Sequence, residues 1–256
     1  MDFLRDTWYL FGRLVQSSIR MPIFLIISVV QPALWVVLFG QLFRSVATIP
    51  GFENDSYIQF LAPGIAIMTS LFSSSYSGMS LLGDIDRGVL DRMLATPASR
   101  AALMVSRLLY SAAQVILQAT IILGVAVLLG ARAKGGLLGL LVVLLAAALL
   151  SVALSAFSNA LGLLTRRQEL ILAISNFTLL PMIFSSSMLM SQHLMPGWLG
   201  VVARFNPINW AVSSARSGFE GQVGSPTLVS LLLLAAFAGV LTLFATRAFR
   251  RYLKSL

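Results

Sequence analysis

Long uncharged apolar runs, separated by short polar links, dominate the chain. Six such runs lack Asp, Glu, Lys, Arg and His, and they cover approximately residues 22–43, 58–83, 108–131, 137–165, 170–190 and 226–246. A helix needs roughly 20 apolar residues to cross the hydrocarbon of a bilayer. Only helices and closed barrels satisfy every backbone polar group in lipid. The pattern therefore predicts an all-α integral membrane protein with six transmembrane helices, in one domain over residues 1–256.

The first residues carry an amphipathic pattern instead. At helical spacing, one face of residues 2–20 is apolar and consists of Phe3, Leu4, Trp8, Phe11, Leu14, Val15 and Ile19. The other face carries Asp2, Arg5, Asp6, Arg13, Gln16 and Arg20. A helix of this kind that ends before Pro22 is typical of a segment lying in the headgroup region of a membrane. We predict an interfacial helix over residues 1–21, with a helix packed against other protein as the alternative.

Composition agrees with a membrane protein and removes several kinds of site. The chain is 58% hydrophobic and its mean hydropathy is +0.90, both high for a soluble domain. The absence of cysteine from the sequence excludes disulfides and thiolate metal sites. The single histidine, His193, excludes a metal site built from several histidines. We therefore expect no metal in this chain.

The net charge is +9, and the predicted topology places most of the basic residues on one side of the membrane. With the N-terminus in the cytoplasm, thirteen of the 18 basic residues lie on the cytoplasmic side: Arg5, Arg13, Arg20, Arg87, Arg92, Arg100, Arg107, Arg166, Arg167, Arg247, Arg250, Arg251 and Lys254. The outer side keeps Arg44, Arg132, Lys134, Arg204 and Arg216. An excess of basic residues inside is the usual membrane pattern. The sequence thus predicts that both termini are cytoplasmic and argues against a nucleic-acid surface.

The apolar runs lack the groups that most transport or catalytic mechanisms need. Coupled transporters usually keep an ionisable residue inside the membrane, and none lies in these six runs. Neither lysine, Lys134 nor Lys254, belongs to a GxxxxGK[ST] phosphate loop. An enzyme would need a catalytic set, but His193 has no acidic sequence neighbour. Any energy for uphill transport must therefore come from a partner.

Neutral polar residues do occur within the runs. They are Gln31, Gln114, Gln118, Asn159 and Asn176, together with serine clusters at Ser73, Ser74, Ser75, Ser77 and Ser80 and at Ser185, Ser186 and Ser187. Such residues commonly form hydrogen bonds between packed helices. The alternative is that they line a mildly polar path for an amphipathic substrate. Both interpretations stay open at this stage.

One short stretch, GDIDRGVLDRMLATPASR, holds six charged residues between positions 84 and 100, although the chain is only 11% charged. We call residues 84–100 the coupling region. Ile85, Val89, Met93 and Leu94 recur at helical spacing, and Pro97 is expected to end the helix. We predict a short helix with Asp84 and Asp86 near its N-terminus, where the helix dipole favours them. Its apolar side chains would sit in a protein partner; a solvated loop is the alternative.

The coupling region resembles the corresponding segment of type 2 ABC exporter permeases, E-x-G-x-L-x-R-L-x-x-T-P-x-S-R. The matching residues are Gly88, Leu90, Arg92, Thr96, Pro97, Ser99 and Arg100, with Asp86 in place of the usual Glu. A second stretch, LMPGWLGVVARFNPINWAVSSARSGFEG, is similar to the signature that precedes the last span of that family. Leu194, Pro196, Asn206, Pro207, Trp210 and Arg216 carry the similarity.

This resemblance implies a function and partners. Two permease chains would pair, and each would bind a cytoplasmic ATPase subunit that holds ATP and Mg. The docking residues would be Asp84, Asp86, Arg87, Gly88, Leu90, Asp91, Arg92, Leu94, Thr96, Pro97 and Arg100. Residues 194–216 would form re-entrant helices near the outer leaflet. The similarity to the daunorubicin-resistance-like branch implies export of a drug or lipid-like molecule across a bacterial cytoplasmic membrane. A polysaccharide or glycolipid permease, or a membrane scaffold, remains the alternative.

Overall fold

The computed structural model describes residues 3–20, 22–42, 56–95, 99–188 and 195–253. Within these ranges the regular structure is entirely α-helical, which confirms the predicted fold class. The helices that correspond to the six predicted spans are α2 (Pro22–Leu42), α3 (Tyr57–Ser75) continued by α4 (Ser77–Asp86), α6 (Arg100–Leu128), α7 (Gly136–Thr165), α8 (Gln168–Phe184) and α11 (Ser225–Leu253).

Four of these spans are long and apolar enough to cross a membrane: α3 with α4, α6, α7 and α11. The apolar parts of α2 and α8 are shorter, covering Ile26–Leu42 and Gln168–Phe184. Several predicted boundaries differ from the structure, since α8 ends at Phe184 rather than at residue 190 and α11 continues to Leu253 rather than to residue 246. The second span is interrupted at Tyr76, and the third begins at Arg100 rather than at residue 108.

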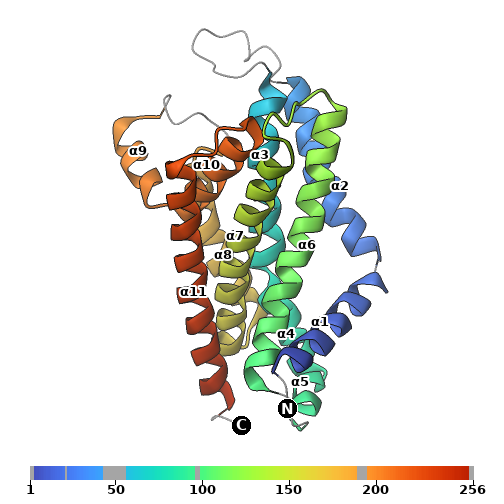
Figure 1. Cartoon of the computed structure of the whole chain (residues 1–256). Helices are drawn as coiled ribbons and strands as arrows, with labels where there is room; N and C mark the ends of the chain where they lie inside the picture. Colours follow the sequence, from blue (N-terminus) through green and yellow to red (C-terminus); the bar gives the residue numbers. More distant parts are fainter. Residues whose placement is uncertain (1–2, 21, 43–55, 96–98, 189–194, 254–256) are drawn as a thin grey trace.

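The remaining helices lie at the two ends of the bundle. They are α1 (Phe3–Ile19), α5 (Val89–Leu94), α9 (Gly197–Arg204) and α10 (Pro207–Glu220). Figure 1 shows α1, α5 and the last turns of α11 at one end, which we call the α5 end. The helices α9 and α10 lie at the opposite end, which we call the α10 end. The chain thus places its two family-like motifs at opposite ends.

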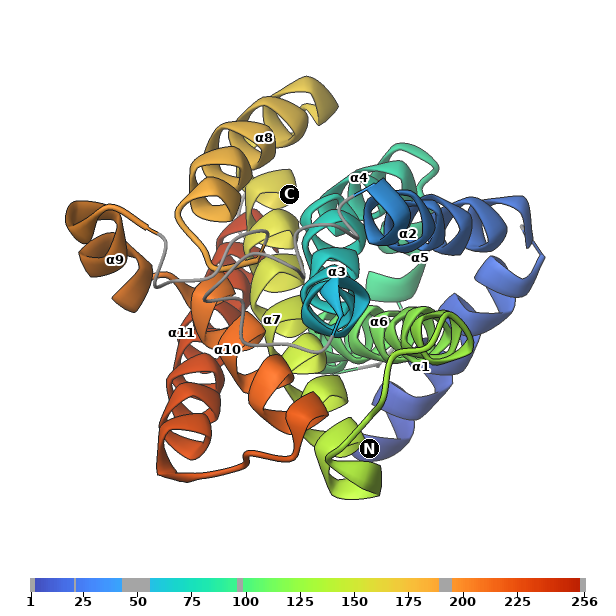
Figure 2. The same cartoon turned by 90° about the horizontal axis from the view of Figure 1, so that it is seen from above.

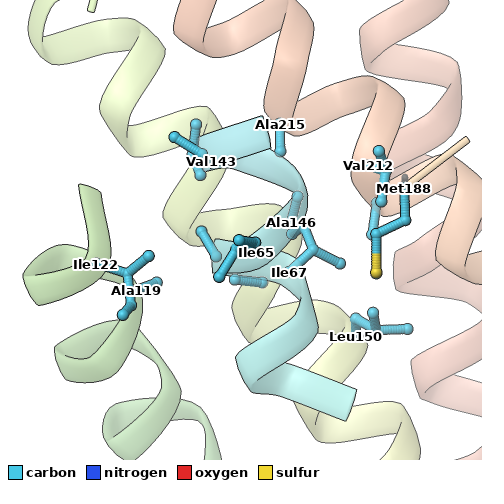
Figure 3. Packing of buried hydrophobic residues seen from close by; sticks show 14 of the residues in the cluster. Ile65, Ile67, Ala119, Ile122, Val143, Ala146, Leu150, Met188, Val212 and Ala215 are labelled. Carbon is cyan, nitrogen blue, oxygen red and sulfur yellow. The ribbon is translucent and has the colours of Figure 1, made fainter. Parts of the chain in front are cut away.

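Helix α7 is the centre of the bundle. It packs against α3, α4, α6, α10 and α11, and the view from above shows α3 and α6 on one side of it and α11 on the other (Figure 2). Figure 3 shows Val143, Ala146 and Leu150 of α7 directed toward the α3 helix that carries Ile65 and Ile67. These side chains are buried, so the core lies along α7.

Two glycine contacts bring backbones close to α7. A Cβ on Gly139 of α7 would collide with the carbonyl oxygen of Gly218 on α10. A Cβ on Gly78 of α4 would collide with the carbonyl oxygen of Ser158 on α7, and the Gly78 N–H donates to the Ser158 hydroxyl at 2.9 Å. Small residues permit this close packing, which helices in lipid depend on because no hydrophobic effect drives them together.

A cluster of buried hydroxyls joins three helices near the interruption at Tyr76. The hydroxyls of Ser74 (α3), Ser111 (α6) and Ser151 (α7) are mutually hydrogen-bonded at 2.7–3.0 Å. In an apolar interior each hydroxyl needs such a partner. The hydrogen bonds that the sequence predicts between spans are therefore present at this serine cluster.

Helix α1 has two different sides. The Asp6 carboxylate accepts a hydrogen bond from the backbone N–H of Ser99 at 3.0 Å, and Ser18 is hydrogen-bonded to Tyr110 on α6. On its other side, Leu4 and Trp8 are 79% and 72% exposed. Asp6 and Ser18 therefore contact the protein, although Arg5, Gln16 and Arg20 are exposed, and large apolar side chains such as Leu4 and Trp8 remain outside the bundle. The predicted interfacial position is compatible with this arrangement and stays a prediction.

Candidate functional site

Gly88 determines where the helix of the coupling region begins. Its φ angle of +62° lies in the left-handed region that glycine adopts easily, and its N–H donates to the Ile85 carbonyl at 2.8 Å. The α4 helix therefore ends at Asp86, and α5 begins at Val89. The prediction that Asp84 and Asp86 lie at the N-terminus of the docking helix is wrong, because both belong to the last turn of α4.

The apolar side of α5 faces its own chain. Leu90 is only 2% exposed and belongs to a buried cluster with Leu103 of α6 and Phe249 of α11. Met93 and Leu94 are partly buried against the same cluster. The expectation that Leu90 sits in a partner is therefore wrong. A short helix at the end of a bundle instead buries its apolar side inward, where apolar surface is already available.

The outward side of the same segment is charged. Asp86, Arg87, Asp91 and Arg92 are exposed, and the Arg92 guanidinium donates to the Gly88 and Arg87 carbonyls at 3.2 and 3.3 Å. Two carboxylates and two guanidinium groups thus form a compact mixed-charge surface, which we call the α5 charged face. Mixed charge at an exposed position favours orientation and selectivity in binding a protein.

Asp84 takes a different role from the one predicted. Only 13% of its side chain is exposed, and its carboxylate pairs with Arg107 of α6, with Arg13 of α1 at 3.6 Å and with Arg87 at 3.4 Å. The Arg107 side chain is 11% exposed. One carboxylate therefore joins α1, α4 and α6 directly behind α5. Sequence reasoning missed this ion cluster because the three arginines come from separate parts of the chain.

The structure describes only part of the remaining coupling region, residues 95–100. Thr96 and Pro97 lie outside the described residues, so their predicted roles are not tested. Ser99 precedes α6, which begins at Arg100. The Asp6–Ser99 hydrogen bond ties α1 to this start, so α1 contacts the coupling region at both Ser99 and Asp84.

The second motif forms the joint between α8 and α10. The Asn206 side chain accepts from the Ile208 N–H at 2.9 Å, which caps α10, and Pro207 occupies the first helical position, where its missing N–H costs nothing. The Asn206 amide also donates to the Met182 carbonyl at 2.6 Å and the Ser185 hydroxyl at 3.0 Å. The Asn-Pro pair therefore starts one helix and attaches it to the end of another.

Arg216 links α10 to α3. Its guanidinium donates to the Phe60 carbonyl at 3.4 Å and to the Met188 carbonyl at 3.0 Å, and it lies over the Phe60 ring at 3.7 Å from the ring centre. Helix α10 is too short to cross a membrane. Burial lowers the pKa of Arg216 to about 9, with Glu220 opposing the shift, so the side chain remains charged at neutral pH.

The other signature residues lie around this joint. The Trp210 indole N–H donates to the Arg204 carbonyl at 2.7 Å, which fixes the turn between α9 and α10. Pro196 caps the start of α9, and Leu194 lies outside the described residues. Two helices shorter than a span, as predicted for residues 194–216, are present at the α10 end. Their depth in a membrane remains a prediction.

The neutral polar residues proposed for a substrate path lie on several helices, and three of them form hydrogen bonds to residues outside their own helices. Gln118 donates to Ser28 of α2 at 2.8 Å, and Asn159 donates to Ser77 of α4 at 3.0 Å. Asn176 is exposed on α8 and accepts from the Tyr76 hydroxyl at 3.1 Å. The remaining two are Gln31, exposed on α2, and Gln114, partly buried on α6. Gln118 and Asn159 thus form interhelical hydrogen bonds, as the first interpretation of these residues predicted.

The fold defines an all-helical, multi-pass membrane protein with an exposed charged face beside α5. Within the described residues, no group of three or more His, Cys, Asp or Glu side chains is placed to hold a metal ion. Residues 5–219 match the family described as ABC-2 type transporter. The chain therefore belongs to the ABC-2 type transporter family.

Individual relatives extend this result over most of the chain. The daunorubicin resistance ABC transporter permease protein DrrB1 of Streptomyces coeruleorubidus is 29% identical over 242 residues, covering 94% of this chain and 83% of the relative. The "Probable doxorubicin resistance ABC transporter permease protein DrrC" of Mycobacterium tuberculosis is 25% identical over 251 residues, covering 97% and 90%. The chain is thus a non-catalytic transmembrane subunit, and a separate ATP-binding partner supplies the ATPase activity.

Proposed function

We propose that this chain is the permease of an exporter that moves a hydrophobic or amphipathic molecule, a drug or a lipid-like compound, out across a bacterial cytoplasmic membrane. The names of two relatives, which refer to daunorubicin and doxorubicin resistance, support a drug. The uncharged spans support an apolar cargo over an ionic polymer such as a charged polysaccharide. Family membership favours transport over a purely structural scaffold.

The observation that carries the docking proposal is the α5 charged face lying over the Asp84 ion cluster. The ATPase subunit would bind Asp86, Arg87, Asp91 and Arg92, all of which are exposed. Leu90 anchors α5 in the core of this chain. Movement of α5 would then displace α4, and Asp84 would pass the displacement to Arg107 on α6 and Arg13 on α1.

The Arg92→Glu variant tests docking. Reversing this exposed charge should lower recovery of the ATPase–permease complex about tenfold, in the range measured for close charge pairs at interfaces. Export of daunorubicin into inverted vesicles with ATP should fall in proportion. Arg250→Glu is the matched control, because Arg250 is also exposed at the α5 end but lies on α11. Equal complex recovery for both variants would contradict docking at α5.

The same vesicles separate transport from scaffolding. A transporter should accumulate the drug only when ATP and the ATPase subunit are both present, whereas a scaffold should assemble normally without accumulation. We also propose two permease chains per complex, as the family resemblance implies. A measured complex mass with one permease chain would contradict that stoichiometry.

The α5 end is proposed to face the cytoplasm, with both termini on that side. The clustering of Arg87, Arg92 and Arg107 at this end supports it through the positive-inside tendency. Because the natural chain lacks cysteine, single-cysteine variants report position cleanly. Ala133→Cys, in the link between α6 and α7, should react with an impermeant maleimide on intact cells, and Asp91→Cys only after permeabilisation. The reverse pattern would overturn this orientation.

A further inference from the structure

A groove of about 790 Å³ lies at the α10 end, between the α9–α10 joint and the start of α11. One wall carries Arg204, Trp210 and Ser213, and the facing wall on α11 carries Val229, Ser230 and Leu233. It is separate from the α5 charged face, which lies at the opposite end of the bundle. The function proposed above makes no use of it.

The polar wall presents a cation without a compensating acid. Arg204 is exposed, and in the part of the chain that the structure describes it has no carboxylate within ion-pair distance. No Asp or Glu occurs among the described residues that line the groove. The Arg204 backbone carbonyl accepts a hydrogen bond from the Trp210 indole at 2.7 Å, which holds this residue at the rim of the groove. An anionic group therefore suits this wall, and a cationic one does not.

The facing wall is apolar and belongs to a helix of membrane length. Val229 is 54% exposed and Leu233 is 42% exposed, one helical turn apart on α11. Ser230 adds a hydroxyl to the same wall. A tryptophan beside a cation at the end of a membrane helix is typical of headgroup depth. The groove thus combines an anion-binding rim with an apolar track that leads along the span.

We propose that this groove binds an anionic phospholipid of the surrounding bilayer. Its phosphate lies at Arg204, with hydroxyls of Ser213 and Ser230 nearby, and its acyl chains lie against Val229 and Leu233. A free phosphate would leave the apolar wall uncovered, and a cationic amphiphile would meet Arg204 unfavourably. The bound lipid covers the joint between α9, α10 and α11.

Quenching of tryptophan fluorescence tests the site in the full-length chain. Trp8, Trp35 and Trp198 are replaced by Phe, so that Trp210 in the groove is the remaining reporter. The protein is reconstituted in phosphatidylcholine vesicles with increasing fractions of chain-brominated phosphatidylglycerol or chain-brominated phosphatidylcholine. One basic residue near the surface gives about a fivefold preference for the anionic lipid, so half-maximal quenching should need about one-fifth as much phosphatidylglycerol.

Three variants test whether Arg204 causes the preference for phosphatidylglycerol. Arg204→Gln should abolish it, although the Trp210 hydrogen bond survives because it uses the backbone carbonyl. Arg204→Lys should retain most of it, and Arg132→Gln, which removes another exposed cation on the α6–α7 link, should leave it unchanged. Equal quenching by the two lipids in the parent protein would mean ordinary bilayer contact and overturn the proposal. A preference that persists in Arg204→Gln would overturn it as well.

Discussion

The two ends of the bundle each enclose an arginine, but they compensate its charge differently. At the α5 end, Arg107 faces the carboxylate of Asp84. At the α10 end, Arg216 faces two backbone carbonyls and the Phe60 ring. The carboxylate of Asp84 contacts Arg107 directly, whereas the groups that contact Arg216 carry partial charges and the carboxylate of Glu220 acts on Arg216 as an additional negative charge. An ion cluster fails badly when its central member is removed, while dipoles around a cation tolerate its loss better.

The largest effect should follow from Asp84→Ala. This change leaves Arg107 without its carboxylate in a largely enclosed site, and breaking a buried pair in this way costs about 3–5 kcal/mol. The free energy of unfolding in detergent, measured by denaturant titration, should fall by that amount. Asp86→Ala is the control, because Asp86 is exposed two residues away. Similar losses in both variants would mean that the ion cluster contributes little.

A smaller loss should follow from Arg216→Ala. The substitution removes a cation that contacts two carbonyls and an aromatic ring, and it also removes the positive charge that acts on Glu220, so the expected cost is about 1–3 kcal/mol. The same titration applies. The loss in free energy of unfolding should be smaller for Arg216→Ala than for Asp84→Ala. A larger loss for Arg216→Ala would contradict the proposed difference between the two ends.

The smallest of the three changes concerns the start of α10. Asn206→Ala removes the cap on the Ile208 N–H, which is worth about 1 kcal/mol, together with the amide that donates to Met182 and Ser185. Asn206→Asp keeps the capping oxygen but loses the amide that donates to Met182 and Ser185. The difference between the two variants in thermal unfolding separates capping from attachment to α8. Identical midpoints would assign the whole effect to attachment.

Hydropathy predicted the helices well because lipid leaves the backbone few alternatives. It missed the interruption at Tyr76, since neither proline nor glycine marks that position and the serine hydrogen bonds around it come from three helices. It also placed Asp84 and Asp86 on the wrong helix. Gly88 was the signal in the sequence that could have corrected this, because helices commonly end at a glycine in the left-handed conformation.

The contacts behind the coupling region could not be predicted in the same way. Helical spacing grouped Ile85 with Val89, Met93 and Leu94, but Ile85 belongs to α4 and the buried side chain of α5 is Leu90. Periodicity also does not say whether an apolar face meets its own chain or another. Leu90 is buried beside Leu10 and Leu14 of α1 and Leu103 of α6. Likewise, the Asn-Pro pair was identified from its motif, whereas its hydrogen bonds to the end of α8 depend on the folded arrangement.

The glycine contacts on α7 have a mechanical consequence. Gly139 meets α10 and Ser158 meets α4, and at 1.5 Å per residue these two points on one helix lie about 29 Å apart. A helix is too stiff along its axis to shorten over that distance. A stiff helix moves as one body, so a displacement of α7 at its contact with α4 is carried along the same helix to its contact with α10.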